Sequence, residues 1–376
     1  MSSSEKYQIC KRCVMDTTDM DIVFDENGYC NHCFQAITIS EHSVKNNERS
    51  QKMLDEVLQN IKAKGKNKKY DCLVGISGGV DSCYIAYLCK TNGLKPLLMH
   101  MDNGWDTEIS VKNIKNVARN LDLDYVSYVL DWQEFREIQL GFLKSSIVDL
   151  EYPTDMAIAA ALNETAVKYD IHYIISGCNS FSESILPLTW GYHVIRDMKI
   201  YKHIVNRYSK LPIKKVPVSG LLNEFYVKFI KNIRTIYLLN YVEYDKDVAK
   251  KILISQLHWE EYGGKHHESK ITAFWQSYAM PVKYNMDYRR ATLSSQIAAG
   301  ITSREDAIEQ LKKLPYNPET VEADKEFVAK KYNITVEELN SYLNLPPKTY
   351  KDFPNEKGLV DFVTKMYVKF FPNKRL

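Results

Sequence analysis

The sequence lacks the features that would mark a membrane or secreted protein. Over its 376 residues no apolar run reaches the length that spans a bilayer, and the first five residues, MSSSE, do not resemble a signal peptide. A strong charge imbalance is also missing, because the net charge of +3 does not by itself call for nucleic acid. We therefore expect a cytoplasmic globular protein without a membrane span, long enough for two or three domains.

Cysteine is scarce, and half of it lies near the N-terminus. Four of the eight cysteines form two C-x2-C pairs separated by sixteen residues, namely Cys10, Cys13, Cys30 and Cys33. Two such knuckles complete a tetrahedral zinc site with no open position, so the site should be structural. Four cysteines can also hold an iron–sulfur cluster, and this alternative stays open at the level of spacing. His32 lies inside a knuckle, where we expect a bystander rather than a ligand.

A glycine-rich loop without lysine follows the first expected strand. Cys72–Ile76 is apolar, Ser77–Ser82 reads S-G-G-V-D-S, and a helix-like segment continues to Asn92-Gly93. Adjacent glycines and a helix N-terminus suit close approach to an anion, and both serines add donors. Asp81 would repel phosphates unless a divalent cation lies between them, so the loop favours Mg²⁺ with a polyphosphate. Because no lysine follows the glycines, this is not a Walker loop. It resembles the PP-loop of ATP pyrophosphatases.

Strands and helices alternate after this loop, which predicts a doubly wound α/β fold with a parallel sheet. Ligands of such sheets bind beyond the carboxyl ends of the strands. The expected strands are 72–76, 96–101, 125–130 and 172–175, and the expected helices between them are 108–121, 133–146 and 155–169, the last capped by Thr154.

The remaining chain divides into segments of different composition. We expect a zinc ribbon with a small hairpin over 1–45, a connector helix and linker over 46–69, the PP-loop domain over 70–235 and a mostly helical region over 236–376. Within the last region, helices are expected over 303–313, 322–332, 335–343 and 358–370. Residues 195–235 are rich in lysine and arginine. The simplest interpretation is a solvated face, and the second is a site for an anionic substrate.

The motifs together resemble the N-acetyl sugar amidotransferases of bacterial surface-polysaccharide and nonulosonic-acid synthesis, which are PP-loop enzymes of the adenine nucleotide alpha hydrolase-like type. The stretches that carry the resemblance are the four-cysteine ribbon, Gly75–Ser82, Asp102–Trp105, Asp131-Trp132, Pro153–Asp155, Gly177–Asn179, Tyr262–Ser269 and Asp287–Arg290.

The resemblance implies a reaction and a set of site residues. A sugar acetamido group would become acetamidino: its oxygen attacks ATP, pyrophosphate leaves, and ammonia displaces AMP from the O-adenylated intermediate. The resemblance implies a catalytic role for five residues, which are Ser77, Asp81, Ser82, Lys265 and His266. It also implies a nucleotide-binding set, made up of Gly75, Ser77, Gly78, Gly79, Val80, Asp81, Ser82, His100, Met101, Asp102, Gly177 and Asn179. His267, Lys270, Arg289 and Arg290 would contact substrate, and Asp81 with Glu183 would hold Mg²⁺.

The source of ammonia can be argued from the residues. Cys178 lies in S-G-C-N-S, which is not the G-x-C-x-G elbow of a class I glutaminase, and Cys10 belongs to a knuckle rather than an N-terminal nucleophile. We therefore expect a separate glutaminase subunit as partner, as the resemblance also implies. The N-acetylated sugar could be free, nucleotide-linked or lipid-linked, and nucleic acid is not the expected partner.

Two other functions compete with this prediction. A tRNA-thiolating PP-loop enzyme is the main rival, although the cysteines outside the ribbon form no second C-x-x-C pair. The other is a zinc-ribbon binding module with a degenerate nucleotide domain, against which the intact Asp81 and both loop serines argue.

Overall fold

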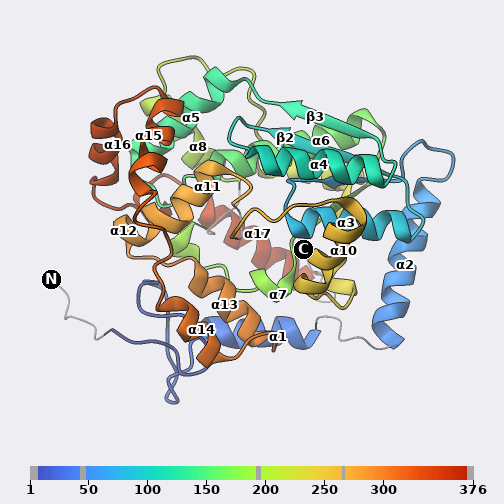
Figure 1. Cartoon of the computed structure of the whole chain (residues 1–376), viewed down its shortest axis with the longest axis horizontal. Helices are drawn as coiled ribbons and strands as arrows, with labels where there is room; N and C mark the ends of the chain where they lie inside the picture. Colours follow the sequence, from blue (N-terminus) through green and yellow to red (C-terminus); the bar gives the residue numbers. More distant parts are fainter. Residues whose placement is uncertain (1–6, 43–47, 192–195, 265–266, 371–376) are drawn as a thin grey trace.

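The computed structural model describes residues 7–42, 48–191, 196–264 and 267–370. Their centre is a five-stranded sheet in the order β3-β2-β1-β4-β5, in which every strand pair is parallel. Its strands are β1 Cys72–Gly75, β2 Pro96–Asp102, β3 Tyr125–Val129, β4 Tyr173–Ser176 and β5 Arg234–Tyr237. The predicted doubly wound α/β fold is confirmed, and Figure 1 shows helices on both faces of the sheet.

The two faces of the sheet are buried in different hydrophobic clusters. Along β1, Cys72 and Val74 face the cluster of α3 (Val80–Thr91), α4 (Glu108–Asn120) and α10 (Lys246–Leu257). Leu73, between them, faces the cluster of α5 (Trp132–Ser145), α6 (Tyr152–Lys168) and α8 (Met198–Tyr208). Side chains alternate along a strand, so a strand covered on both faces must be apolar at every position. This explains the continuous apolar run at the start of the PP-loop segment.

Two elements of the α/β fold, the helix α6 and the strand β5, differ from the expectation. The helix expected from residue 155 starts at Tyr152, its N-cap is Glu151, and Pro153 occupies its first turn, so the cap predicted at Thr154 is wrong. Proline fits the first turn because its fixed φ is helical and its missing N–H has no partner there. The sequence also gave no sign of β5, an edge strand of four residues without a buried face, which crosses the expected domain limit at residue 235.

The small hairpin and the connector helix expected near the N-terminus are present, and one further helix, α1, was not expected. An antiparallel bridge joins Phe24 to Cys30 around the turn at Gly28, which forms the small hairpin between the knuckles. The helix α1 (Asn31–His42) follows, and α2 (Glu48–Lys64) buries Leu54, Leu58 and Ile61 against the sheet domain. The apolar residues of α2 recur every three to four positions, as on one face of a helix, and this pattern predicts the connector helix.

Helices fill most of the chain after β4. They include α7 (Ser180–Glu183), α9 (Leu221–Phe225), α11 (Lys270–Phe274), α12 (Met280–Tyr284), α13 (Arg289–Ala298), α14 (Arg304–Leu311), α15 (Val321–Tyr332), α16 (Val336–Leu343) and α17 (Lys357–Phe370). Short 3₁₀ turns lie at Leu188–Trp190, Leu238–Tyr241 and Tyr350–Asp352, and π-helical turns at Tyr226–Ile230 and Trp275–Ala279. The four helices expected between 303 and 370 are confirmed to within a few residues.

The ribbon packs on the helical region rather than standing apart. Arg304 donates to the carbonyl oxygens of Cys10 and Cys13 at 3.0–3.2 Å, and the Val14 N–H donates to Ser294 Oγ at 3.1 Å. In Figure 1, α1 lies beside α13 and α14. None of the described helices is both long and apolar enough to cross a membrane.

Candidate functional site

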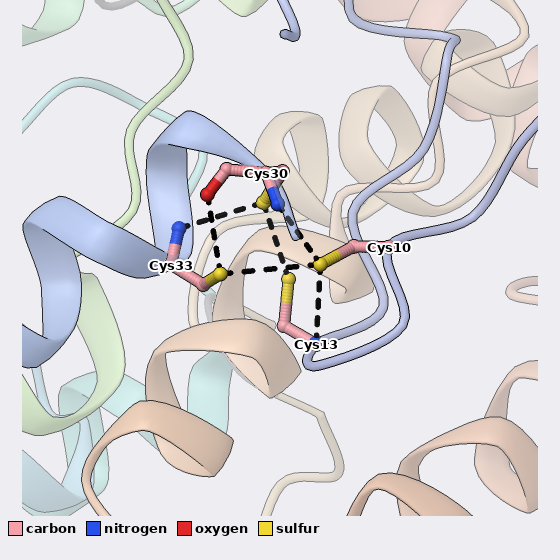
Figure 2. A group of neighbouring side chains, drawn as sticks. All are labelled: Cys10, Cys13, Cys30 and Cys33. Carbon is pink, nitrogen blue, oxygen red and sulfur yellow. Dashed lines mark hydrogen bonds between the residues drawn. The ribbon is translucent and has the colours of Figure 1, made fainter. Parts of the chain in front are cut away.

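The four N-terminal cysteines converge on one point. Their Sγ atoms all lie within 4.8 Å of one another, with 3.9 Å from Cys10 to Cys33 and 3.5 Å from Cys13 to Cys30 (Figure 2). A tetrahedral metal ion with metal–sulfur bonds of about 2.3 Å separates its ligand sulfurs by about 3.8 Å. A cluster of several iron atoms would hold its cysteine sulfurs farther apart. The spacing therefore fits a single tetrahedral ion.

Hydrogen bonds to sulfur support thiolate ligands at this site. The backbone N–H groups of Arg12, Cys13 and Cys30 donate to Cys10 Sγ at 3.2–3.4 Å. His32 is turned away, because its Nε2 lies 2.5 Å from Asp19 Oδ2. His32 therefore stands apart from the sulfurs, as expected of a bystander, and the four cysteines each offer one ligand atom to a metal ion.

The PP-loop is held by its two serines and two glycines. Ser77 Oγ lies 3.2 Å from Ser82 Oγ and accepts a hydrogen bond from the Gly79 N–H at 3.3 Å. Gly78 has a φ of +85°, and a Cβ there would lie 2.4 Å from the Ser110 carbonyl oxygen. No other residue fits this turn, which brings the loop backbone to the N-terminus of α3. The arrangement suits an anion, as the sequence predicts.

Asp81 and the end of β4 meet at the same helix terminus. The Tyr244 hydroxyl donates a hydrogen bond to Asp81 Oδ1, and burial together with the Asp81 charge raises the pKa of Tyr244. At Gly177, a Cβ would lie 3.1 Å from the Ser82 nitrogen, so the loop after β4 passes close to the PP-loop. The Asn179 side chain accepts from the Ser182 N–H at 3.1 Å and caps α7. Local structure therefore explains why glycine stands at 177 and asparagine at 179, beside the nucleotide-binding roles predicted for both.

The carboxyl end of β2 carries a buried histidine. His100 Nδ1 lies 3.2 Å from the Ile76 carbonyl oxygen, and its Nε2 lies 3.2 Å from Asp106 Oδ2. Burial lowers the pKa of His100, but the hydrogen bond and charge of Asp106 outweigh it, so the net pKa is raised. Met101 is buried in the core, and the Asp102 carboxylate accepts from the Gly104 N–H at 2.9 Å.

Trp259 and Glu268, from far along the chain, contact the PP-loop. Ser77 Oγ donates to Glu268 Oε1 at 3.4 Å, and Trp259 Nε1 donates to the Gly78 carbonyl oxygen at 2.9 Å. The Thr107 N–H donates to the Glu268 carbonyl oxygen at 2.9 Å, which ties the segment to the loop after β2. Burial raises the pKa of Glu268. Glu268 lies in the stretch Tyr262–Ser269 that carries the resemblance, but it was not selected as a site residue. Tyr244 and Trp259 lie outside that stretch and were not selected either.

The other predicted residues have varied surroundings. Lys265 and His266 lie outside the described residues. His267 accepts from the Gly264 N–H at 3.2 Å, burial lowers its pKa, and it is 3.3 Å from Ser277 Oγ. Lys270 begins α11 with its N–H on the Trp105 carbonyl oxygen. Their substrate contacts stay predictions.

Arg289 and Arg290 have structural partners. Arg289 makes a bidentate pair with Asp287 and donates to two carbonyl oxygens at the end of α14. Arg290 Nε lies 3.0 Å from Asp16 Oδ2, and its Nη1 donates to the Val14 carbonyl oxygen at 2.8 Å. The substrate contact expected of both stays a prediction, but each already holds the ribbon or α14 in place.

Three carboxyl groups lie close together in sequence at the N-terminus of α6, those of the partly buried Asp149 and Glu151 and of the exposed Asp155. Burial raises the pKa of Glu151 to about 7 and that of Asp155 to about 6, and raises the pKa of Asp149 as well. Glu183 is near enough for its charge to contribute to the raised pKa of Asp155, while Arg196 opposes it. Asp155 lies in the stretch Pro153–Asp155, which carries part of the resemblance but was given no role of its own. The magnesium role of Glu183 stays a prediction.

Two family models match separate parts of this arrangement. One, for NAD synthase, matches residues 48–140, which hold β1, the PP-loop and β2. The other, described as the C-terminal domain of LPS biosynthesis protein WbpG-like proteins, matches residues 268–367. Together the two matches support an amidotransferase-type PP-loop family in lipopolysaccharide biosynthesis. The family predicted from the motifs is confirmed at this level.

Individual relatives are distant. A tRNA(Ile)-lysidine synthase from Chlamydia muridarum is 35% identical over 69 residues, which are 18% of this chain and only 21% of that protein. An NH3-dependent NAD synthetase from Campylobacter jejuni has a TM-score of 0.31 at 18% identity, over 72% of this chain and 97% of that one. An NMN synthetase from Francisella tularensis scores 0.34 at 14% identity, over 73% and 99%. The U34-tRNA thiolase NcsA from Methanococcus maripaludis, with its [4Fe-4S] cluster, scores 0.32 at 13% identity, over 81% and 89%.

Proposed function

We propose that the chain is an ATP-dependent N-acetyl sugar amidotransferase, which converts an acetamido group to acetamidino and releases AMP and pyrophosphate. The observation that supports this best is the contact between Ser77 and Glu268. Ser77 belongs to the segment matched by NAD synthase, and Glu268 is the first residue of the WbpG-like match. A substrate bound by the WbpG-like region would thus lie directly beside the phosphate-binding loop.

The residues of the loop suit the first half of this reaction. An amide oxygen is a weak nucleophile, so catalysis depends on positioning and on neutralising charge on the leaving pyrophosphate. Ser77, Ser82 and the N-terminus of α3 would bind pyrophosphate oxygens, and Asp81 would hold Mg²⁺, which supplies positive charge to the phosphates when bound. Tyr244 orients the Asp81 carboxylate through its hydrogen bond.

The second half requires ammonia from elsewhere. Cys178 is the one exposed cysteine of the eight, all of which lie in the described ranges, and it has no nucleophile elbow around it. A separate glutaminase subunit would therefore deliver ammonia to this chain. The four-cysteine site would hold zinc, for which the closely spaced sulfurs give support.

The test is pyrophosphate release by the purified chain with Mg-ATP, ammonium chloride and a panel of diacetamido sugars and their nucleotide conjugates. We expect sugar-dependent pyrophosphate and AMP, together with a product in which one oxygen is replaced by NH, identified by mass spectrometry. Ser82→Ala should abolish release, whereas Ser255→Ala, on the exposed part of α10, serves as a matched control. Release stimulated by bulk tRNA and by no sugar would reject the proposal in favour of tRNA modification.

A further inference from the structure

A cleft in the helical region has no part in the proposed reaction. Its volume is about 540 Å³, and ligand pockets are typically about 300–1,000 Å³. Residues of α12, α15 and α16 line it, and Figure 1 shows these helices together at the left of the molecule. All of its described lining residues fall within 268–367, the stretch of the WbpG-like match. The cleft is therefore a feature of that region and not of the PP-loop domain.

Both walls of the cleft are fixed to the same turn of the chain. On one side, the hydroxyl of Tyr284, the last residue of α12, donates to the carbonyl oxygens of Ser146 and Ile147 at 3.1 and 3.0 Å. On the other side, Ser146 Oγ donates to the Pro346 carbonyl oxygen at 2.7 Å, and the Lys348 N–H donates to the Ser146 carbonyl oxygen at 3.0 Å. The cleft is thus preformed, as ligand pockets usually are.

The first of two lysines that line the cleft has no acidic partner. Lys283, in the last turn of α12, forms no ion pair with any described residue, and its Nζ donates to the Tyr342 carbonyl oxygen at 2.6 Å. Burial lowers the pKa of Lys283 to about 8. A half-buried ammonium group is costly unless an anion lies beside it, so this side chain calls for a negatively charged ligand.

The second lysine adds a charge that its neighbours offset only in part. Lys325, from α15, is 8% exposed, and its Nζ lies 2.8 Å from Glu322 Oε1 and 5.1 Å from the centre of the Tyr278 ring. The Glu322 side chain is 70% exposed, so water screens this ion pair from one side. The described lining residues include no aspartate or glutamate. The cleft therefore presents two ammonium groups and no carboxylate.

Two amide side chains and an apolar wall complete the cleft. Asn340 lies on α16, and Asn344 follows it four residues later, so the two side chains lie on one face of that helix. No hydrogen bond joins either amide group to a described residue, which leaves both able to donate to a ligand. The apolar part of the wall includes Leu343, Leu345, Pro346 and Pro347.

We propose that the cleft binds an organic diphosphate, with Lys283 and Lys325 on its phosphate groups and the apolar wall against its organic part. Lysine binds phosphate as a point charge, and two lysines match two adjacent phosphate groups better than the single charge of a carboxylate. Asn340 and Asn344 supply further donors. The volume and the apolar wall favour a nucleoside diphosphate over inorganic pyrophosphate. This inference goes beyond the proposed function and does not depend on the reaction.

The test is calorimetric titration of the full chain with uridine and adenosine diphosphates. EDTA is present to remove the Mg²⁺ on which phosphate binding at the PP-loop would depend. We expect one site per chain, with affinity reduced about tenfold or more in Lys283→Gln and in Lys325→Gln, as for loss of a hydrogen bond to a charged group. Glutamine at 283 can still donate to the Tyr342 carbonyl oxygen, so α16 keeps this contact. Lys312→Gln is the matched control, because that exposed lysine pairs with Glu309 outside the cleft.

Hydrogen exchange then locates the bound nucleotide. We expect protection of residues 278–284 and 340–348 on adding the nucleotide, with no change at 77–82, and about tenfold weaker binding of inorganic pyrophosphate. Lys283→Arg should retain most of the affinity, because it keeps the charge. The inference is overturned if neither nucleotide binds, if both glutamine variants bind as the wild type does, if protection is confined to the PP-loop, or if pyrophosphate binds as tightly as the nucleotides. Failure of sugar-dependent pyrophosphate release would reject the proposed function and leave this binding test unaffected.

Discussion

The four-cysteine ribbon and the PP-loop are both short ligand-binding motifs, but they are completed in different ways. The ribbon ligands Cys10 and Cys33 are only 23 positions apart, and the site is closed by its own two knuckles. Around the PP-loop, Ser77 contacts Glu268, 191 positions away, and Asp81 contacts Tyr244, 163 positions away. The ribbon is therefore specified by local spacing, whereas the PP-loop gives an anion-binding turn whose surroundings only the folded chain provides. Four experiments test this contrast.

The largest effect should follow removal of the ribbon metal. Zinc binding to four-cysteine sites contributes about 10–16 kcal/mol to folding of small zinc domains. We expect mass spectrometry of metals to find one zinc ion per wild-type chain. In the Cys30→Ser variant we expect this zinc to be lost and residues 7–42 to unfold. Hydrogen exchange should show the ribbon open while the sheet stays protected. Stoichiometric iron with sulfide instead of zinc would show that the ligand spacing was misinterpreted.

Next in size should be the loss of catalysis on changing Asp81. Asp81→Asn keeps the shape but removes the negative charge that would hold Mg²⁺, so pyrophosphate release should fall about 10²–10³-fold with little change in stability. Tyr244→Phe should cost less, about tenfold, and mainly in the Mg²⁺ concentration required. Equal losses in both variants would mean that Tyr244 acts directly on substrate rather than on Asp81.

A third, smaller effect concerns the pH dependence of stability at Glu151, the N-cap of α6. Glu151 has its pKa raised from 4.5 to about 7 by burial, so the native state holds more protons than the unfolded state between these values. The free energy of unfolding should therefore fall as pH rises through this range, by at most about 3 kcal/mol. The free energy of unfolding is measured by urea titration at pH 5 and at about pH 8. In Glu151→Gln, the fall in this free energy between the two pH values should lose the part that Glu151 contributes. Glu164→Gln on the same helix should leave it, and an unchanged slope in Glu151→Gln would contradict the assignment.

The smallest effect should come from the contact that joins the ribbon to the helical region. Arg290→Ala leaves the buried carboxylate of Asp16 without its ion pair, although the Tyr7 and Thr18 hydroxyls still donate to it. We expect a loss of about 2 kcal/mol in the free energy of unfolding and an unchanged KM for sugar. The exposed Lys312→Ala should change neither quantity. A higher KM with unchanged stability would support the substrate contact predicted from the sequence.

How far the sequence led depended on how local each signal was. Strands buried on both faces, such as 72–76 and 96–101, were recognised because every position had to be apolar. The helices near the C-terminus were recognised as short helices broken by prolines, and Ser303 and Thr335, expected as first helical residues, are the N-caps of α14 and α16. β5 was missed because an exposed edge strand has no alternating apolar pattern.

The sequence alone therefore determined the convergence of the four cysteines, the Ser-Gly-Gly-Val-Asp-Ser turn and the alternation of strands and helices behind the parallel sheet. Each of these depends on residues close together in the chain, where spacing fixes geometry. Only the tertiary structure decided which distant groups complete the site, bringing Tyr244, Trp259 and Glu268 to the PP-loop. Such pairs leave no local pattern, because packing between separate elements brings them together and any spacing along the chain can satisfy it.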